Sequence, residues 1–213
     1  MTELSGFFIT FEGTDGCGKT TQIKLLENIL KEKGYDVVCV REPGGTTIGE
    51  KVRQIIIDRD NSLMTPQTEA LLYAACRAQL VSEVIIPALR DGKIVISDRF
   101  LDSNIVYQGL ARGLGEDEIL SINQRATVGL APDITFFLKL SVEGSIKRKS
   151  NFKELDRLES EDFNFHQRVY DGYVYLSRKN ADRIITIDAE KAPELIHEEI
   201  LDILKGIMKD RGL

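Results

Sequence analysis

Short apolar runs alternate with segments of helix-spaced apolar residues along the whole chain. The first run spans residues 7–11, and Ile23, Leu26 and Leu30 follow it at helical spacing. Strands that alternate with helices in this way form crossover units of a parallel sheet covered on both faces. The pattern predicts one α/β domain over residues 1–213, with strands at 7–12, 36–41, 93–97, 133–138 and 183–188 and a last helix at about 192–210.

A glycine-rich loop follows the first expected strand directly. Residues 13–20 read Gly-Thr-Asp-Gly-Cys-Gly-Lys-Thr, which fits G-x-x-x-x-G-K-[ST] without a gap. In such a loop the backbone N–H groups point at phosphate oxygens, the lysine reaches the β- and γ-phosphates, and the last hydroxyl binds Mg²⁺. The flanking strand and helix favour a three-layer P-loop NTPase fold with a central parallel five-stranded sheet over an ordinary turn. The residues expected to bind ATP are Gly13, Thr14, Asp15, Gly16, Cys17, Gly18, Lys19, Thr20 and Thr21.

Polar residues follow two further expected strands at the same edge of the sheet. Asp98 and Arg99 come directly after 93–97, and the loop 41–47 follows 36–41. Ligands of open parallel sheets bind at the carboxyl ends of the strands. An aspartate in this place holds Mg²⁺ in phosphoryl-transfer enzymes, and a neighbouring arginine grips phosphate oxygens. We therefore expect Thr20 and Asp98 to bind Mg²⁺ and Arg99 to contact phosphate, against the alternative of a surface ion pair.

The composition narrows the setting of this site. Of 213 residues, 42% are hydrophobic and 29% are charged, as in ordinary soluble domains, and the formal net charge is −6. An acidic chain argues against nucleic acid as a partner, because polyanion binding needs a basic face. The sequence has neither an apolar run of membrane-spanning length nor the pattern of a leader, so we expect a cytoplasmic protein without a membrane partner. Three widely spaced cysteines predict neither a disulfide framework nor a zinc site.

A helix expected to begin at Thr65-Pro66 carries an aromatic residue and a cation on one face. Tyr73 and Arg77 are four residues apart, so they lie one turn above the other. A ring and a guanidinium placed in this way can clamp a flat base, the ring by stacking and the arginine by bonding to its edge. Taken alone, such a pair is more typical of core packing beside a solvated arginine.

Five motifs, one of which contains Tyr73 and Arg77, favour base binding over core packing for this pair. In chain order they are Phe11–Gly16, Arg41–Thr46, Leu72–Gln79, Asp98–Gly109 and Leu155–Glu159. Together they closely resemble thymidylate kinase, and the resemblance runs from residue 7 to about 188. Five motifs in register are far more specific than the phosphate loop alone. The resemblance implies transfer of the γ-phosphoryl group of ATP to dTMP, giving dTDP and ADP in dTTP biosynthesis, with Mg²⁺ as cofactor and a homodimer as the assembly.

The resemblance also implies how the acceptor is held. Tyr73 would stack on thymine, Arg77 would donate to thymine O4, and Asn104 would contact the N3 edge. Cytosine has an amino donor where thymine has O4, so it would leave the guanidinium without an acceptor. Tyr107 would lie below the sugar and leave little room for a 2′-hydroxyl. The other residues expected to bind dTMP are Asp15, Arg41, Pro43, Arg99, Ser103 and Gln108.

A basic segment at 147–159 departs from the family pattern. It carries five basic and three acidic side chains, and we expect it to form a mobile lid rather than a solvated helix face. Some thymidylate kinases have an arginine in the phosphate loop where this chain has Gly16, so the lid is expected to supply a cation. The family's arginine-glycine before Glu-Leu-Asp-Arg is replaced by Phe152-Lys153, which leaves the choice of cation open. The expected catalytic residues are Lys19, Arg99, Asp15, Arg148, Lys153 and Arg157, with Lys149 a further lid candidate.

Two other functions are alternatives to a dTMP kinase. A kinase for a different nucleoside monophosphate or a deoxynucleoside predicts loss of the set Tyr73, Arg77, Asn104 and Tyr107, which the sequence retains. A guanine-nucleotide switch needs an N-K-x-D motif, and the sequence contains none. Both alternatives are therefore weaker than a dTMP kinase.

Overall fold

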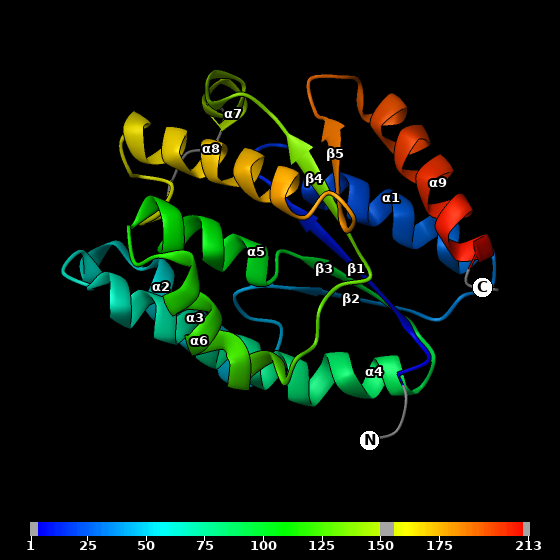
Figure 1. Cartoon of the computed structure of the whole chain (residues 1–213), viewed down its shortest axis with the longest axis horizontal. Coiled ribbons are helices and arrows are strands. Elements are labelled where there is room, and N and C mark those ends of the chain that lie inside the picture. Colours follow the sequence, from blue (N-terminus) through cyan, green and yellow to red (C-terminus); the bar gives the residue numbers. More distant parts are fainter. Residues whose placement is uncertain (1–3, 150–155, 211–213) are drawn as a thin grey trace.

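Five parallel strands form one sheet at the centre of the protein (Figure 1). The computed structural model describes residues 4–149 and 156–210. The strand order is β2-β3-β1-β4-β5, so the chain builds one half of the sheet and then crosses β1 to build the other. A reversal of this kind opens a crevice at the carboxyl ends of the strands. The strands are β1 (Phe7–Glu12), β2 (Val37–Arg41), β3 (Ile94–Asp98), β4 (Ile134–Lys139) and β5 (Ile184–Asp188).

These strands confirm the α/β prediction. Each lies within one residue of its predicted bounds, and the last helix, α9 (Pro193–Asp210), begins one residue after the predicted start. The hydrophobic pattern succeeded here because both faces of a parallel sheet are buried, which makes every strand a short apolar run. The predicted lid falls partly outside the description, since residues 150–155 are not among the described residues.

The two faces of β1 carry different contacts. Phe7, Ile9 and Phe11 point to one face, which α1 (Lys19–Glu32) and α9 cover with a shared apolar cluster. Figure 1 shows these two helices lying side by side on that face. Phe8 and Glu12 point to the opposite face, where Glu12 stands at the carboxyl end of the strand. A carboxylate therefore enters the interior next to the phosphate loop.

Helices of the opposite face bring the remaining site residues to this edge. α3 (Pro66–Leu80) continues through the π-helical segment η2 (Val81–Ile85) into α4 (Ile86–Arg90) and packs on Phe8 and Val95. The π-helical segment η3 (Ile105–Ala111) packs with α6 (Glu116–Thr127) and α8 (Phe163–Lys179) in a further apolar cluster. Wide helical turns of this kind are frequent at functional sites. The other helices are α2 (Thr47–Ile57), η1 (Arg59–Asn61), α5 (Leu101–Asn104) and α7 (Val142–Lys149).

Side-chain caps fix where three of these helices begin. The Thr46 hydroxyl accepts from Gly49 N–H at 2.9 Å, and the predicted cap Thr65 accepts from Thr68 N–H at 3.3 Å. Asp162 accepts from Phe165 N–H at 2.7 Å at the start of α8. Such caps satisfy backbone donors that the helix itself leaves free. They set the register of α2, α3 and α8, on which Arg53, Tyr73 and Tyr173 reach the site.

Candidate active site

The phosphate loop joins β1 to α1 and curls around its own lysine. Gly13, Gly16 and Gly18 have φ values of 141°, 81° and 100°, a region that side chains other than glycine rarely adopt. A Cβ on Gly13 would also lie 2.7 Å from the carbonyl oxygen of Leu138. Lys19 Nζ donates to the Gly13 carbonyl at 3.1 Å, so the ammonium is held inside the curve of the loop. This is the concave backbone that suits a phosphate group.

Thr20 and Asp98 meet at the mouth of this loop. The Thr20 hydroxyl, in the first turn of α1, donates to Asp98 Oδ2 at the end of β3 at 3.2 Å. Thr20 follows β1 through the phosphate loop and Asp98 ends the neighbouring strand β3, so the two oxygens meet at one edge of the sheet. A hydroxyl and a carboxylate side by side are hard oxygen ligands of the kind that Mg²⁺ prefers.

Two hollows open at this edge of the sheet. The broad one, of about 560 Å³, lies over the phosphate loop, and the narrow one, of about 90 Å³, runs between α2, α3 and η3. Four residues line both, so the hollows adjoin each other; these are Asp15, Glu42, Arg53 and Arg99. The broad hollow is otherwise lined by Gly16, Gly18, Lys19, Thr20, Thr21, Arg41, Asp98, Arg148 and Glu159. The narrow hollow is otherwise lined by Pro43, Ile57, Tyr73, Ser103, Tyr107, Gln108, Asp156 and Leu158.

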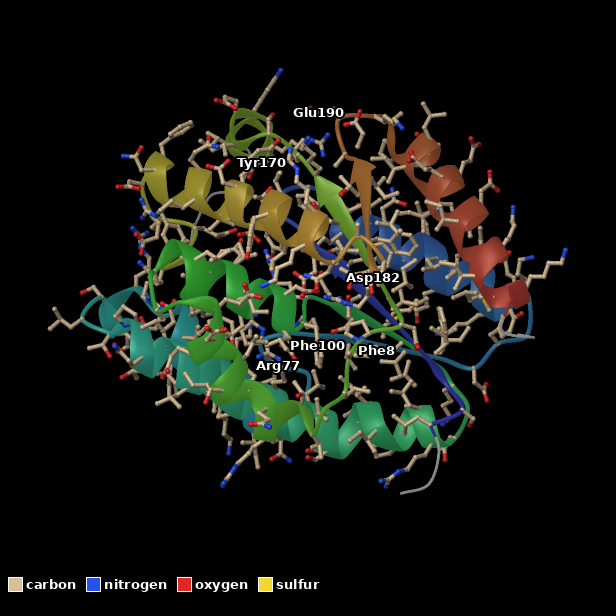
Figure 2. All side chains as sticks on the ribbon, in the orientation of Figure 1. Phe8, Arg77, Phe100, Tyr170, Asp182 and Glu190 are labelled. Carbon is tan, nitrogen blue, oxygen red and sulfur yellow. The ribbon has the colours of Figure 1, made fainter. Side chains whose placement is uncertain are left out.

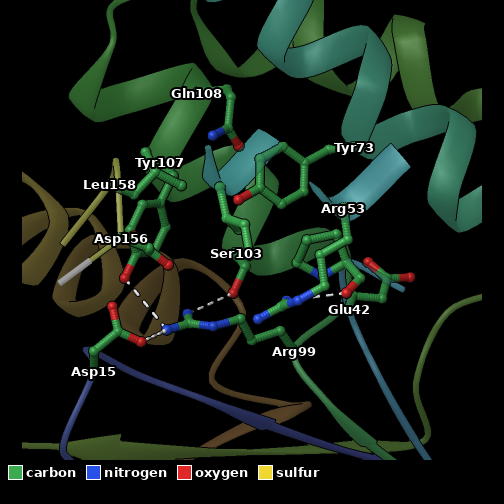
Figure 3. A pocket seen from close by; sticks show the side chains of 12 residues that line it. Asp15, Glu42, Arg53, Tyr73, Arg99, Ser103, Tyr107, Gln108, Asp156 and Leu158 are labelled. Carbon is green, nitrogen blue, oxygen red and sulfur yellow. Dashed lines mark hydrogen bonds and ion pairs between the residues drawn. The ribbon is translucent and has the colours of Figure 1, made fainter. Parts of the chain in front are cut away.

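Arg99 stands at the junction of the two hollows (Figure 3). Its Nη2 donates to Asp15 Oδ1 at 2.6 Å, and its Nη1 donates to the hydroxyls of Ser103 and Tyr173, each at 3.0 Å. The guanidinium also lies over the ring of Tyr107, 5.2 Å from its centroid. Hydrogen bonds from both Nη atoms and the ring against one face fix the orientation of the guanidinium. An arginine that binds phosphate oxygens requires such a fixed orientation.

Aromatic rings and an amide form the far end of the narrow hollow. Tyr73 of α3 and Tyr107 of η3 both line it, and burial raises the pKa of both hydroxyls, which keeps the rings neutral. Gln108 donates to Glu69 at 2.7 Å and accepts from Asn104 Nδ2 at 2.7 Å, so its amide is held in one orientation. Neutral rings with an oriented amide suit a flat, uncharged heterocycle.

Arg77 and Asn104 lie one layer behind this surface. Arg77 is 1% exposed and does not line either hollow, although it stands on α3 one turn from Tyr73. Figure 2 shows it in the interior beside Phe100, whose ring centroid is 5.4 Å from the guanidinium carbon. Its donors are all used by Glu42, Asn104, Asn123 and the Phe100 carbonyl. Burial raises the pKa of Glu42, and Arg77 opposes that rise.

Two cations enter from α2 and β2. Arg41 lines the broad hollow and forms a two-pronged ion pair with Glu50, at 2.8 and 2.9 Å. Arg53 lines both hollows and donates to the Pro43 carbonyl at 3.1 Å. The sequence prediction included Arg41 and missed Arg53. The signal was the four-residue spacing of Gly49, Arg53 and Ile57, which puts them on one face of α2.

The lid candidates separate in space. Arg148 of α7 lines the broad hollow and donates to the carbonyls of Gly16 at 3.3 Å and Ala189 at 2.8 Å. Arg157 is buried elsewhere, where it pairs with Glu69 at 2.6 Å and donates to the Ile56 carbonyl at 2.8 Å. Lys153 lies outside the described residues. Of the lid cations named from the sequence, Arg148 is the one whose described side chain reaches the phosphate loop.

Several other residues of the site carried no recognisable signal in the sequence. Asp156, Leu158 and Glu159 lie at the end of the expected lid and line the hollows, but they were identified only as part of a family motif. Glu12 was named only within the motif Phe11–Gly16 and Tyr173 was not identified; both lie behind Arg99 rather than in a hollow. A site of this shape brings a triphosphate end to end with a small anionic acceptor that carries a flat ring. On this fold, that arrangement defines the P-loop kinases of small phosphorylated substrates.

Comparison with known proteins narrows the class to one family. A sequence model of the thymidylate kinase family matches residues 11–200. The chain is 51% identical over 206 residues to the thymidylate kinase of Caldanaerobacter subterraneus subsp. tengcongensis, which covers 97% of this chain and 98% of that protein. It is 46% identical to the thymidylate kinase of Exiguobacterium sibiricum, over 99% and 100% of the two chains. The crystal structure of thymidylate kinase from Ehrlichia chaffeensis matches with a TM-score of 0.76 and 34% identity, covering 94% of this chain and 99% of that one.

The chain belongs to the thymidylate kinase family. It is a phosphotransferase that phosphorylates dTMP to dTDP. The predicted family and reaction are therefore confirmed.

Proposed function

We propose that the broad hollow binds the phosphates of ATP and the narrow hollow binds dTMP, with the phosphoryl group passing between them beside Arg99. The observation that carries this assignment is the lining shared by the two hollows, because in-line transfer needs donor and acceptor phosphates to meet. Lys19 and the loop N–H groups would hold the donor side. Arg99 and Arg53 would hold the acceptor phosphate.

The reaction requires charge neutralisation more than proton transfer. A monophosphate oxygen is already ionised at neutral pH, since its second pKa is about 6, so no general base is needed. The obstacle is the approach of two polyanions and the charge spread over the transferring group. Lys19, Arg99 and Arg148 surround the broad hollow with three cations that can offset this charge. We assign Arg148 as the lid-side cation, because Gly16 offers no side chain and Arg148 bonds to its carbonyl.

The thymine ring would lie between Tyr73 and the amide of Gln108. Arg77 supports this end of the hollow from behind, since it donates to Asn104 at 3.0 Å and Asn104 in turn donates to Gln108. Direct donation from Arg77 to thymine O4 requires the guanidinium to exchange one of its present partners. Asp15 and Tyr107 flank the position of the sugar between base and phosphate.

Thr20 and Asp98 would hold Mg²⁺. The pair fits this ion, because Mg²⁺ in nucleotide sites takes one or two protein oxygens and completes its shell with phosphate oxygens and water. Among the described residues no group of three His, Cys, Asp or Glu side chains is placed to form an all-protein metal cage, which agrees with such a partial site. When bound, the ion would neutralise charge on the donor phosphates.

A coupled ADP-release assay tests the assignment of acceptor and donor. Turnover is expected with dTMP and little with dCMP, dGMP, AMP or thymidine, while the response to dUMP measures the contact with the thymine methyl group. Lys19→Ala should abolish turnover with the fold intact, whereas the exposed Lys24→Ala on the same helix should leave it near normal. A Lys19→Ala variant of near-normal rate would refute the role of the phosphate loop.

The assembly and location are proposed on separate grounds. Ile48 and Ile55 of α2, Leu71 of α3, and Leu120 of α6 are exposed apolar side chains on three helices that pack side by side, which suits an interface with a second copy of the chain. The stretch Pro66–Arg90 is long and apolar enough to cross a membrane by length and composition alone. It contains the buried Arg77 and packs on the sheet, as a core helix does, so we propose a cytoplasmic homodimer.

A further inference from the structure

Three side-chain oxygens meet behind Arg99, and of their residues only Ser103 lines a hollow. They are Glu12 Oε2 at the end of β1, the Ser103 hydroxyl of α5 and the Tyr173 hydroxyl of α8. Each oxygen contacts the other two: Tyr173 lies 3.0 Å from Glu12 and 2.8 Å from Ser103, and Ser103 bonds to the same Glu12 oxygen. All three residues are buried, and the Tyr173 side chain stacks on Phe137 at a centroid distance of 5.3 Å.

Three mutual contacts among three oxygens need three protons. The Ser103 and Tyr173 hydroxyls supply one each, and an ionised carboxylate supplies none. A protonated Glu12 supplies the third, so that each oxygen donates once and accepts once. The other carboxyl oxygen, Oε1, accepts from Phe100 N–H at 2.7 Å and from Ser103 N–H at 3.3 Å. It can accept in either protonation state, although the Phe100 bond lowers the pKa of Glu12. Proton counting thus favours a neutral Glu12.

Two of the three oxygens bind the Arg99 guanidinium. Arg99 Nη1 donates to Ser103 and Tyr173, at 3.0 Å each, and so uses the lone pairs that the three mutual contacts leave free. Its Nη2 then faces Asp15 and the junction of the hollows. If Glu12 were ionised, its charge would compete with Asp15 and with a bound phosphate for the same cation.

We propose that Tyr173, together with a protonated Glu12, is a positioning residue that aims Arg99 at the acceptor phosphate. This inference rests on the proposed role of Arg99 as a ligand of the dTMP phosphate. Tyr173 does not touch the hollows itself; it acts through the guanidinium, and it stands on the helix that follows the lid.

The charged surroundings of Glu12 agree with the neutral form. Burial, with the neighbouring carboxylate of Asp102, raises the pKa of Glu12 to about 7. The Arg99 guanidinium lowers that pKa, and Arg183, which also faces Glu12, pairs with Asp102 at 2.8 Å. Tyr173 is the titratable group that faces Glu12 from α8, and burial raises the pKa of its hydroxyl. The Glu12 carboxyl therefore gains or loses its proton within the physiological pH range.

The first test removes one hydroxyl. Tyr173→Phe keeps the ring against Phe137 and deletes the bonds to Arg99 and Glu12. It should raise the KM for dTMP by about tenfold or more, the loss expected for a hydrogen bond to a charged group, with the KM for ATP within about twofold. The matched control is Tyr175→Phe on the same helix, whose hydroxyl is 3.4 Å from Glu116 and whose side chain is 47% exposed. Equal KM values for dTMP in the two variants would overturn the proposal.

The second test removes the ionisation of Glu12. In Glu12→Gln the side chain is neutral at every pH, and the amide oxygen can still accept from Phe100 and Ser103 N–H. The amide nitrogen donates to a hydroxyl as the protonated carboxyl does, but it cannot accept the bond from Tyr173. The KM of Glu12→Gln for dTMP at pH 6 should lie between those of the unmodified chain and of Glu12→Ala, which leaves both hydroxyls without this partner. The ratio of the KM of the unmodified chain to that of Glu12→Gln should rise from pH 6 to pH 8.5, and ionisation of dTMP cancels in this ratio. A ratio that stays constant over this range would overturn the role of the Glu12 proton.

Failure of the proposed function and failure of the positioning proposal give different experimental results. If the unmodified chain does not phosphorylate dTMP, the proposed function fails before any variant is compared. If it does, and Tyr173→Phe raises the KM for dTMP and for ATP equally, the hydroxyl has only a structural role and the positioning proposal fails. Circular dichroism and the melting temperature of each variant separate both outcomes from loss of the fold.

Discussion

Arg99 adopts a backbone conformation that few side chains other than glycine occupy. Its φ is 71°, and this geometry costs about 1–2 kcal/mol. The Arg99 N–H donates to the Phe11 carbonyl at 2.9 Å, and the Ser97 hydroxyl donates to the Arg99 carbonyl at 2.6 Å. The turn therefore directs the guanidinium away from the direction of β3 and back across the end of β1.

The position of Arg99 could be predicted from the sequence, but its contacts could not. Asp98-Arg99 follows an apolar run, which is a local signal. Its partners Asp15 and Tyr173 are 84 and 74 residues away along the chain, so no local pattern records them. The same limit applies to Arg77, whose spacing from Tyr73 predicts one helix face but not its burial among Glu42 and Asn123.

Replacing Arg77 should damage both stability and acceptor binding. Arg77→Ala leaves the Glu42 carboxylate buried without its partner, a cost of about 3–5 kcal/mol in the free energy of unfolding. It also frees Asn104 and Gln108, so the KM for dTMP should rise far more than the KM for ATP. Urea unfolding and steady-state kinetics measure the two effects, and equal rises in both KM values would contradict the support of the base site.

The protonation of Glu12 should appear in the pH dependence of stability. Its pKa is raised from an ordinary 4.5 to about 7 in the folded chain. Between these values the folded state keeps a proton that the unfolded state has lost, so stability falls as the pH rises from about 4.5 to 7, by up to about 3 kcal/mol. Glu12→Gln removes this contribution, and its melting temperature relative to the unmodified chain should increase by several degrees over that interval. The exposed Glu118→Gln serves as the control, and a parallel pH profile for Glu12→Gln would contradict the shift.

At the scale of elements, the end of the expected lid is tied to the helix that bears Tyr73. The Arg157–Glu69 pair links the segment beginning at Asp156 to α3, and Arg157 N–H also donates to the Ile57 carbonyl at the end of α2. Arg112 adds a second ion pair to Glu69 at 3.4 Å. The strands and the phosphate loop were predictable because their signals are continuous in sequence, whereas this junction joins residues 88 positions apart.

Two arginine variants distinguish the role of Arg148 beside the phosphate loop from the role of Arg157 beside α3. Arg148→Ala removes the cation beside Gly16 and should lower kcat by about 10²–10³, the range for losing one donor to developing charge, with little change in melting temperature. Arg157→Ala should lower the free energy of unfolding by about 1–3 kcal/mol, because Glu69 loses its closest partner. Melting curves and kcat values for both variants give the comparison, and the reverse pattern would make Arg157 the catalytic cation.

At the scale of the whole molecule, the layer of α2, α3 and α6 exposes large apolar side chains among its polar ones. Leu71 is 57% exposed in the middle of this layer, beside the exposed Ile48 and Ile55 of α2. The sequence predicts α3 correctly but not this exposure, because an apolar helix reads alike whether it faces a core or a partner chain. Only the packing of the neighbouring helices shows which side chains are left uncovered.

A charge on this layer should separate the proposed dimer. Leu71→Glu would place a carboxylate in the proposed interface, so the chain should sediment as a monomer, at roughly half the mass of the proposed dimer. Leu63→Glu is the control, since Leu63 is 94% exposed in the turn before α3 and should not change the mass. Analytical ultracentrifugation measures both variants. A monomeric unmodified chain would contradict the proposed assembly.

The shared lining of the two hollows has a consequence for inhibitor design. The side chains of Asp15, Glu42, Arg53 and Arg99 line both, so side chains lie where the proposed nucleoside and triphosphate spaces meet. A compound that tethers a thymidine head to a polyphosphate tail can therefore occupy both without displacing a backbone segment. Once one half is bound, the other half binds at a high effective concentration. A compound with a well-matched tether should therefore exceed the affinity of either half by about 10²–10⁴.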